Sequence, residues 1–245
     1  LMGAGIALAT TVGAIIGFAF KRITHKAHDA MMGFAAGVML AASVFGLIEP
    51  AAGGGSAPEL IVMIAGVLAG TGFVSAADRL VPHLHSVVGV RPTDEHASSH
   101  LNKVLLFVLA IAIHNFPEGM AVGVGFGGGE ISHALMVALG IAMQNVPEGF
   151  VVIFPLMQTG MSRPRVLGIA LFTGLVELLG TIVGILLTSI SATLLPFLLA
   201  FAGGTMLYII CDEIIPDTHS HGFEKIATFC LIGGFLLMMV MDAIL

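Results

Sequence analysis

The sequence is poor in charged residues. Only 10% of its 245 residues are Asp, Glu, Lys or Arg, whereas a soluble domain carries about 25%. That is too few to cover a globular surface, and 57% of the residues are hydrophobic. The scarcity of charge excludes an ordinary soluble protein and favours a membrane protein, whose lipid-facing surface needs no charged cover.

Other absences narrow the class. The net charge of −6 is spread thinly, and no basic patch is present to bind nucleic acid. Cys211 and Cys230 have no Cys-x-x-Cys partner and are predicted to be small buried hydrophobes. The first apolar run ends in Lys21 and Arg22 rather than in a small-residue cleavage site, so no removable signal peptide is predicted. No stretch of about ten residues alternates with period two, which disfavours an outer-membrane barrel.

Long apolar segments are abundant. A helix needs roughly 20 apolar residues to cross the bilayer core, and the chain offers eight such segments. We therefore predict an all-α membrane protein, a single transmembrane domain over residues 1–245 embedded in the lipid bilayer. The predicted spans are residues 2–20, 30–48, 60–79, 102–126, 131–156, 165–189, 192–214 and 225–244.

The positive charges divide the links between these spans into two groups. All nine Lys and Arg residues lie in or beside four alternate links: Lys21, Arg22, Lys26, Arg79, Arg91, Lys103, Arg163, Arg165 and Lys225. With eight spans, these four links share one side of the membrane, and the positive-inside rule makes that side cytoplasmic. Both termini are then expected outside, and the longest link, residues 80–101, is expected in the cytoplasm.

Three glutamates fall deep inside predicted spans, namely Glu118, Glu148 and Glu177. An ionisable side chain at mid-bilayer costs at least about 2.5–3.5 kcal/mol, and no Lys or Arg lies in the interior of any predicted span. Their missing partner is therefore a proton, a mobile cation, or both. Protons are expected to compete with a cation for Glu118 and Glu148, which would make the binding and movement of that cation depend on pH.

Two of the glutamates belong to related motifs, HNFPEG from His114 and QNVPEG from Gln144. Positions i and i+4 share one face of a helix, so His114 pairs with Glu118 and Gln144 with Glu148. Each pair has the geometry to hold one ion. Imidazole nitrogen combined with amide and carboxylate oxygens suits zinc, and also iron, manganese or cadmium.

The motifs also predict irregular backbone and internal symmetry. Pro117 and Pro147 cannot donate to the carbonyls of the preceding turn, so both helices are expected to kink there. A short link makes the two helices antiparallel, which relates the motifs by a pseudo-two-fold axis in the membrane plane, where inverted-repeat transporters place their substrate sites. The alternative is that the polar residues are hydrogen-bonded helix-packing contacts without a metal.

At these residues the chain resembles the ZIP (Zrt/Irt-like protein) divalent metal transporter family, in its bacterial GufA-like branch. The resemblance covers essentially the whole chain. It implies a 3+2+3 inverted-repeat bundle, in which spans 1–3 and 6–8 surround spans 4 and 5, in the cell inner membrane. It also implies transport of zinc, or of cadmium, iron or manganese, toward the cytoplasm by alternating access, with the metal as cargo rather than as a cofactor.

The resemblance implies a binuclear metal site. The first centre would comprise His114, Glu118, Gln144 and Glu148, and the second Asn115, Asn145 and Glu177. Glu118 and Glu148 would be able to bridge the two. Relative to family members that carry an aspartate at position 145, Asn145 is an uncharged and weaker ligand, which puts the occupancy of the second centre in doubt.

Further residues match the family pattern less specifically. Met39 matches a methionine near the first centre, although a core methionine is an equally good reading. Asp242 matches an aspartate at the metal entrance, and Asp212 and Glu213 lie where exit-side ligands are expected.

The loop histidines are the least specific candidates. His83 and His85, in the link of residues 80–101, and His219 and His221, after the seventh span, are either metal contacts or ordinary solvated histidines. No role is predicted for His25, His28 or His133.

Other function classes have less support. An intramembrane metalloenzyme would need a motif such as His-Glu-x-x-His, which is absent, as is the Gly-x-Ser-x-Gly elbow, so no enzyme activity is expected. A metal sensor without net transport and a proton-coupled metal exporter remain alternatives. Metal preference, direction of transport, and the choice between monomer and homodimer stay open.

Overall fold

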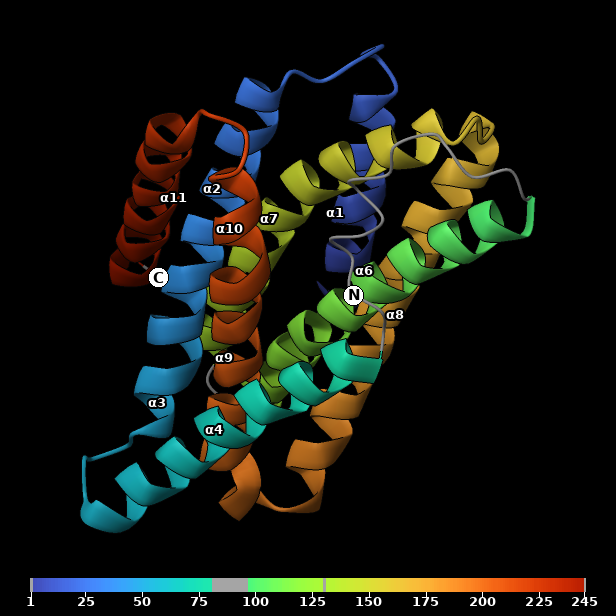
Figure 1. Ribbon diagram of the computed structural model, residues 1–245. Helices are drawn as coiled ribbons and strands as arrows, with labels where there is room; N and C mark the ends of the chain where they lie inside the picture. The colour runs from blue at the N-terminus through green and yellow to red at the C-terminus, as the bar shows by residue number, and fades with distance from the viewer. Residues whose placement is uncertain (1, 81–96, 130, 245) are drawn as a thin grey trace.

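The computed structural model describes residues 2–80, 97–129 and 131–244, and over these residues the chain is helical without any strand (Figure 1). The all-α prediction is therefore confirmed. The helical elements are α1 (Met2–Gly17), α2 (His25–Ser43), η1 (Val44–Ile48), α3 (Glu49–Ala51), α4 (Ala57–Leu80), α6 (Ala97–Gly127), α7 (Ile131–Gln158), α8 (Arg163–Ile190), η2 (Ala192–Leu194), α9 (Leu195–Ile209), η3 (Ile210–Ile214), α10 (Ile215–Thr218) and α11 (Glu224–Ile244).

Many of these helices are suited to a lipid bilayer. Within the described residues, six segments are long and apolar enough to cross a membrane: His25–Ala51, Ala57–Ala77, Ala134–Gln158, Arg163–Ile190, Leu195–Thr218 and Glu224–Ile244. The apolar helix Gly3–Gly17 is shorter. Large apolar side chains such as Ile61, Leu68 and Phe229 are exposed on the outside of the bundle, where lipid would cover them.

Local sequence signals set the ends of several helices. The Thr24 hydroxyl accepts a hydrogen bond from the Ala27 amide at 3.2 Å and caps the start of α2. Gly160 and Gly222, in the links before α8 and α11, have φ angles of +81° and +87°. Residues with a side chain rarely adopt this left-handed conformation, so glycine allows the tight turn in both links.

Proline is accommodated in two different ways. Helices α6 and α7 continue as α-helix through Pro117 and Pro147. In contrast, the five-residue π-helices η1 and η3 interrupt two long rods, α2–η1–α3 and α9–η3–α10, and each lies two residues before a proline, Pro50 or Pro216. A proline ring clashes with the carbonyl four residues earlier, and in both rods that carbonyl lies within the wider π turn.

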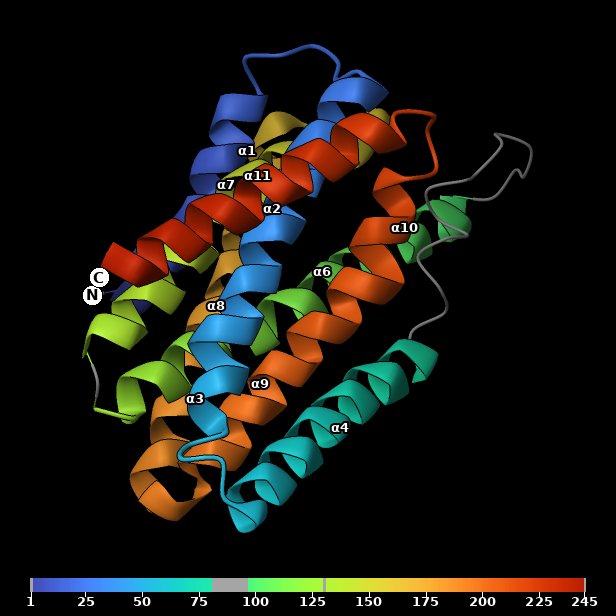
Figure 2. The same cartoon turned by 90° about the vertical axis from the view of Figure 1, so that its left-hand side faces the viewer.

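The helices pack in matching pairs (Figures 1 and 2). Helix α1 packs mainly against α7, and α8 packs mainly against α6. On the other side of the bundle, α11 lies along α2 and α4 lies along α9 (Figure 2). The pair α1–α7 thus corresponds to the pair α8–α6, and the pair α2–α11 corresponds to the pair α9–α4.

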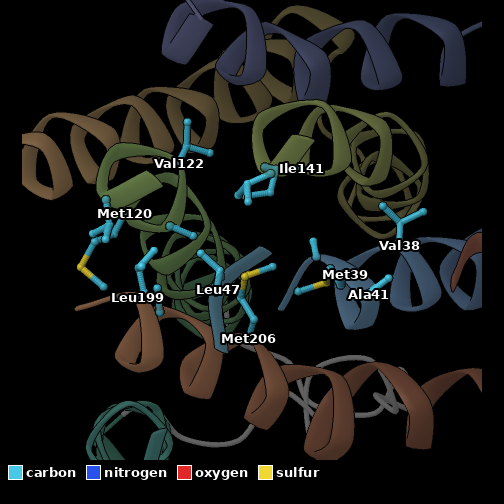
Figure 3. Close-up of a cluster of buried hydrophobic side chains, with 14 of the residues drawn as sticks. Val38, Met39, Ala41, Leu47, Met120, Val122, Ile141, Leu199 and Met206 are labelled. Carbon is cyan, nitrogen blue, oxygen red and sulfur yellow. The ribbon is translucent and has the colours of Figure 1, made fainter. Parts of the chain in front are cut away.

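The apolar core lies where α2, α6, α7 and α9 meet (Figure 3). Met39, Leu47, Ile141 and Met206 are among its largest fully buried side chains. Met39 therefore lies in the apolar core, and the π-helix η1 contributes Leu47 to the same cluster. The outer helices also contribute to this core, through Val74 of α4 and Met238 of α11.

The links gather at two ends of the bundle. Residues 18–24, 159–162 and 219–223 lie at the upper end in Figure 1, whereas residues 52–56 and 191–194 lie at the lower end. The upper links contain or adjoin Lys21, Arg22, Arg163 and Lys225. These positive charges therefore share one end of the molecule.

Glycine brings some helices into direct backbone contact. A side-chain carbon added at Gly180 of α8 would overlap the carbonyl oxygen of Phe116 in α6, and one added at Gly119 would overlap that of Glu177. Small residues at such crossings allow transmembrane helices to approach closely. The two crossings fix the separation of α6 and α8 beside the glutamates that both helices carry.

We predict that Gly180→Ala destabilises the protein by about 1–3 kcal/mol, because the added methyl group must push α6 away from α8. Gly168→Ala is the matched control on the same helix: Gly168 is exposed, and no atom lies within 4 Å of an added carbon. That change should stabilise the helix by up to about 1 kcal/mol. Thermal unfolding in detergent measures both; equal unfolding temperatures for the two variants would contradict the proposed packing.

Candidate metal site

The two proline-glutamate motifs lie within α6 and α7, and α8 supplies Glu177. The glycine after each motif glutamate meets the backbone of a neighbouring helix. Gly119 meets Glu177 of α8, and Gly149 meets Thr10 of α1. The motif sequence therefore brings four helices together around the glutamates.

The polar side chains of this region are withdrawn from solvent. The exposed fraction is 1% for Glu118, 0% for Glu177, Gln144 and Asn145, and 3% for Asn115. His114 and Glu148 are partly buried. Burying polar and ionised groups is costly unless they are hydrogen-bonded or bound to a cation, so each group needs a partner.

Hydrogen bonds join the three helices through two amide side chains. Gln144 Nε2 donates to Glu118 Oε1 at 2.8 Å and so links α7 to α6. Asn145 Nδ2 lies 2.7 Å from Glu177 Oε1 and 2.9 Å from Oε2, and so links α7 to α8. These contacts hold the carboxylates in place but satisfy only part of their capacity to accept hydrogen bonds.

Four buried oxygens of the same groups have no hydrogen-bond partner among the described residues: Glu118 Oε2, Gln144 Oε1, Asn145 Oδ1 and Glu148 Oε1. Amide oxygens and ionised carboxylate oxygens only accept hydrogen bonds. A cluster of buried oxygens without donors is a suitable environment for a cation. Helix-packing hydrogen bonds alone account for the two amide contacts but leave these four oxygens unexplained.

The electrostatics favour the same conclusion. Glu148 interacts with the charges of Glu118 and Glu177, and Glu177 interacts with Glu118. The sequence contains no Lys or Arg between residues 104 and 162 or between residues 166 and 224. No basic side chain of α7, of the motif region of α6, or of the Glu177 region of α8 therefore compensates these carboxylates, which leaves a proton or a mobile cation.

His114 and Asn115 connect the site to other helices. His114 Nε2 lies 3.3 Å from Glu213 Oε2, which belongs to the π-helix η3. Asn115 Nδ2 lies 3.4 Å from the Thr173 carbonyl oxygen of α8, a long contact. His114 thus lies between the glutamates of the site and a carboxylate on the rod α9–η3–α10.

The remaining candidates are dispersed. Asp212 is exposed on η3, and Asp242 is half-buried near the end of α11. The ring of His219 faces the Ile215 carbonyl oxygen at 2.9 Å and the Thr228 hydroxyl at 3.1 Å, so both its nitrogens have partners within the chain.

His221 lies apart from His219 and contacts Asp29 of α2, a contact that the sequence analysis did not foresee. His83 and His85 lie outside the described residues.

The donor set of the central site consists of one imidazole together with carboxylate and amide oxygens. Zinc accepts histidine nitrogen and carboxylate oxygen, and manganese and iron tolerate the same mixture. Its side chains come from three neighbouring helices, so small movements of these helices relative to one another would change the coordination. The arrangement has the chemistry to bind a divalent transition metal.

Comparison with known proteins agrees with this chemistry. Residues 85–242 match the family model described as ZIP Zinc transporter. The chain is 41% identical to the zinc transporter GufA of Myxococcus xanthus, with 98% of each chain covered. It is 39% identical to the zinc transporter ZIPB of Bordetella bronchiseptica, over 100% of this chain and 80% of that protein.

A human relative is also similar. The zinc transporter ZIP11 of Homo sapiens is 31% identical, over 95% of this chain and 93% of its own length. The matched regions therefore extend over nearly the whole sequence. This chain is a multi-pass membrane protein that belongs to the ZIP zinc transporter family.

Proposed function

We propose that this protein carries zinc or a similar divalent cation across the cell membrane through the site between α6, α7 and α8. The observation that carries the proposal is the group of four buried oxygens, on Glu118, Gln144, Asn145 and Glu148, that have no hydrogen-bond donor within the described part of the chain. A mobile cation compensates the carboxylates while it is bound.

The site holds two adjacent centres in this proposal. His114, Glu118, Gln144 and Glu148 form the first, and Asn115, Asn145 and Glu177 form the second. The amide contacts support this division, because Gln144 is hydrogen-bonded to Glu118 and Asn145 is hydrogen-bonded to Glu177. Asn145 contributes no charge, so the second centre binds metal more weakly than the first.

The bundle has a 3+2+3 inverted-repeat architecture in this proposal. The matching helix pairs support it, because α1 packs on α7 as α8 packs on α6. The crossings also correspond: Gly13 of α1 meets Val146, and Gly180 of α8 meets Phe116. Val146 and Phe116 each directly precede the proline of a motif. The α–π–α rods α2–η1–α3 and α9–η3–α10 are a third matching pair.

One position breaks this symmetry and affects the distribution of negative charge around the ion. Thr10 of α1 meets Gly149 in the way that Glu177 of α8 meets Gly119. One repeat thus supplies a hydroxyl where the other supplies a carboxylate. The negative charge is greater on the α8 side, so the second centre lies toward α8.

The proposed movement is toward the cytoplasm, and the placement of the charges gives the orientation of the protein in the membrane. The end that carries Lys21, Arg22, Arg163 and Lys225 faces the cytoplasm, and both termini face outward. The contact of His114 with Glu213 provides the first step from the central site toward that end. Asp242, near the end of α11, attracts metal on the opposite side. The helices give access to the site from each side in turn.

Replacing Glu118 with alanine should reduce zinc uptake into liposomes at least tenfold, because the first centre loses a buried carboxylate. Purified protein is reconstituted with a zinc indicator inside the liposomes. The control is Glu224→Ala, which removes an exposed glutamate at the start of α11 and should leave uptake unchanged. Cadmium, iron and manganese are then compared in the same assay.

The outcomes separate transport from binding alone. If the wild type takes up zinc and Glu118→Ala takes it up equally fast, a path through this site is refuted. No uptake by the wild type, despite tight zinc binding and an imposed pH gradient, would favour a metal sensor instead.

Replacing Asn145 with aspartate should increase the zinc affinity of the second centre by about tenfold, because a charged ligand replaces a neutral one. The same change removes an amide that donates to Glu177, and losing such a buried partner costs about 1–3 kcal/mol. The variant should therefore unfold at a lower temperature in chelator and recover with zinc. Competition binding and thermal unfolding measure the two effects.

An Asn145→Asp variant with unchanged zinc affinity would show that residue 145 does not face the ion. Asn145→Ala is the companion variant: it also loses the amide, but it adds no ligand. It should share the instability in chelator and show no recovery with zinc at the second centre.

A further inference from the structure

A second cluster of metal-ligating side chains lies away from the motif glutamates, at the end of the bundle that carries the positive links. His28 and Asp29 belong to the first turns of α2, and His221 lies in the link between α10 and α11. One ligand atom from each of the three residues lies within 4.8 Å of the others. Two segments far apart in the sequence therefore meet at a compact group of two imidazoles and one carboxylate.

The carboxylate is at the centre of this cluster. Asp29 Oδ1 lies 2.9 Å from His221 Nδ1 and 3.1 Å from His28 Nδ1. Asp29 is fully buried, and its second oxygen, Oδ2, has no hydrogen-bond partner among the described residues. Hydrogen bonds alone leave this buried oxygen unsatisfied, because both imidazoles are directed at the other one. A cation that contacts both carboxylate oxygens would satisfy Oδ2 while it shares Oδ1 with the imidazoles.

Neighbouring side chains hold the two imidazoles in place. The ring of His25 stacks on that of His221 with the centroids 4.4 Å apart. The other ring nitrogen of His28, Nε2, lies 3.6 Å from Asp217 Oδ2. Histidine ligands commonly have a carboxylate on the nitrogen that faces away from the metal, which fixes the orientation of the ring. Asp217 lies on that side of His28, at a distance from which it could take this supporting role.

The spacing of the three groups suits zinc. Zinc binds histidine nitrogen and carboxylate oxygen at about 2.0–2.2 Å, so ligand atoms of a tetrahedral ion lie roughly 3.3 Å apart. The observed separations of 2.9 and 3.1 Å between the ring nitrogens and Asp29 Oδ1 are close to that value. His28 and His221 are each partly exposed, so the fourth position is open to water.

We propose that His28, Asp29 and His221 form a separate zinc site that joins the start of α2 to the link between α10 and α11. The site is distinct from the centres between α6, α7 and α8, and its existence does not depend on their function. Zinc bound there would stabilise the positive end of the bundle, because it connects two segments through ligands that are 192 residues apart.

The test uses the full chain with the central site disabled by Glu118→Ala and Glu148→Ala. In detergent, this background should still bind one zinc per chain, and cobalt should give the visible absorption of a tetrahedral site with nitrogen ligands. Adding His221→Ala should lower the remaining affinity at least tenfold. His219→Ala is the matched control, because the ring of His219 has its own partners in Ile215 and Thr228, and it should leave binding unchanged.

Thermal unfolding tests whether a variant that binds no zinc is still folded. Zinc should raise the unfolding temperature of the background and of its His219→Ala variant, but not that of its His221→Ala variant. If the background binds no zinc, or if His221→Ala binds it as tightly as His219→Ala, the proposal is overturned and the cluster is a hydrogen-bonded group only. A wild type that transports no zinc, with a background that still binds it, would reject the transport proposal and retain this one.

Discussion

The structure depends on one constraint: three carboxylates are held inside an apolar bundle, where no basic side chain of the surrounding helix segments neutralises them. Glu118, Glu148 and Glu177 are close enough to repel one another. The amides of Gln144 and Asn145 offset part of this repulsion, and the rest requires a proton or a mobile cation. The glycines beside the glutamates and the continuous helices through the prolines serve to bring the carboxylates together.

Much of this arrangement could be predicted from the sequence. The apolar segments marked the helices, because a span needs a long apolar run whatever its neighbours are. The i, i+4 spacing within HNFPEG and QNVPEG selected the polar residues of the central site, and the structure brings Gln144 to Glu118. That contact supports the grouping inferred for the first centre, whereas the division into two centres remains a prediction.

Other features depend on contacts between distant segments, which sequence periodicity does not encode. The cluster of His28, Asp29 and His221 was missed because a histidine and an aspartate at the start of a helix are usually solvated. Only the structure shows that the link after α10 lies against them. The run His25-Lys-Ala-His28-Asp29 was the available signal. The π-helices were not predicted either, and Pro50 and Pro216, each two residues after a π-helix, were the available signals.

The glycine contacts have a mechanical consequence. Within the group α1, α6, α7 and α8, glycines such as Gly13, Gly119 and Gly180 rest on the backbone of the next helix, so these helices cannot slide past one another without steric overlap. Toward α2 and α11 the contacts are different: Gly46 meets the side chains of Val137 and Met136, and Gly140 meets that of Met238. Methionine is flexible and adapts to displacement. The four helices that carry or surround the glutamates are thus packed rigidly through backbone contacts, whereas their contacts at Gly46 of η1 and at Met238 of α11 are made by side chains that can adapt.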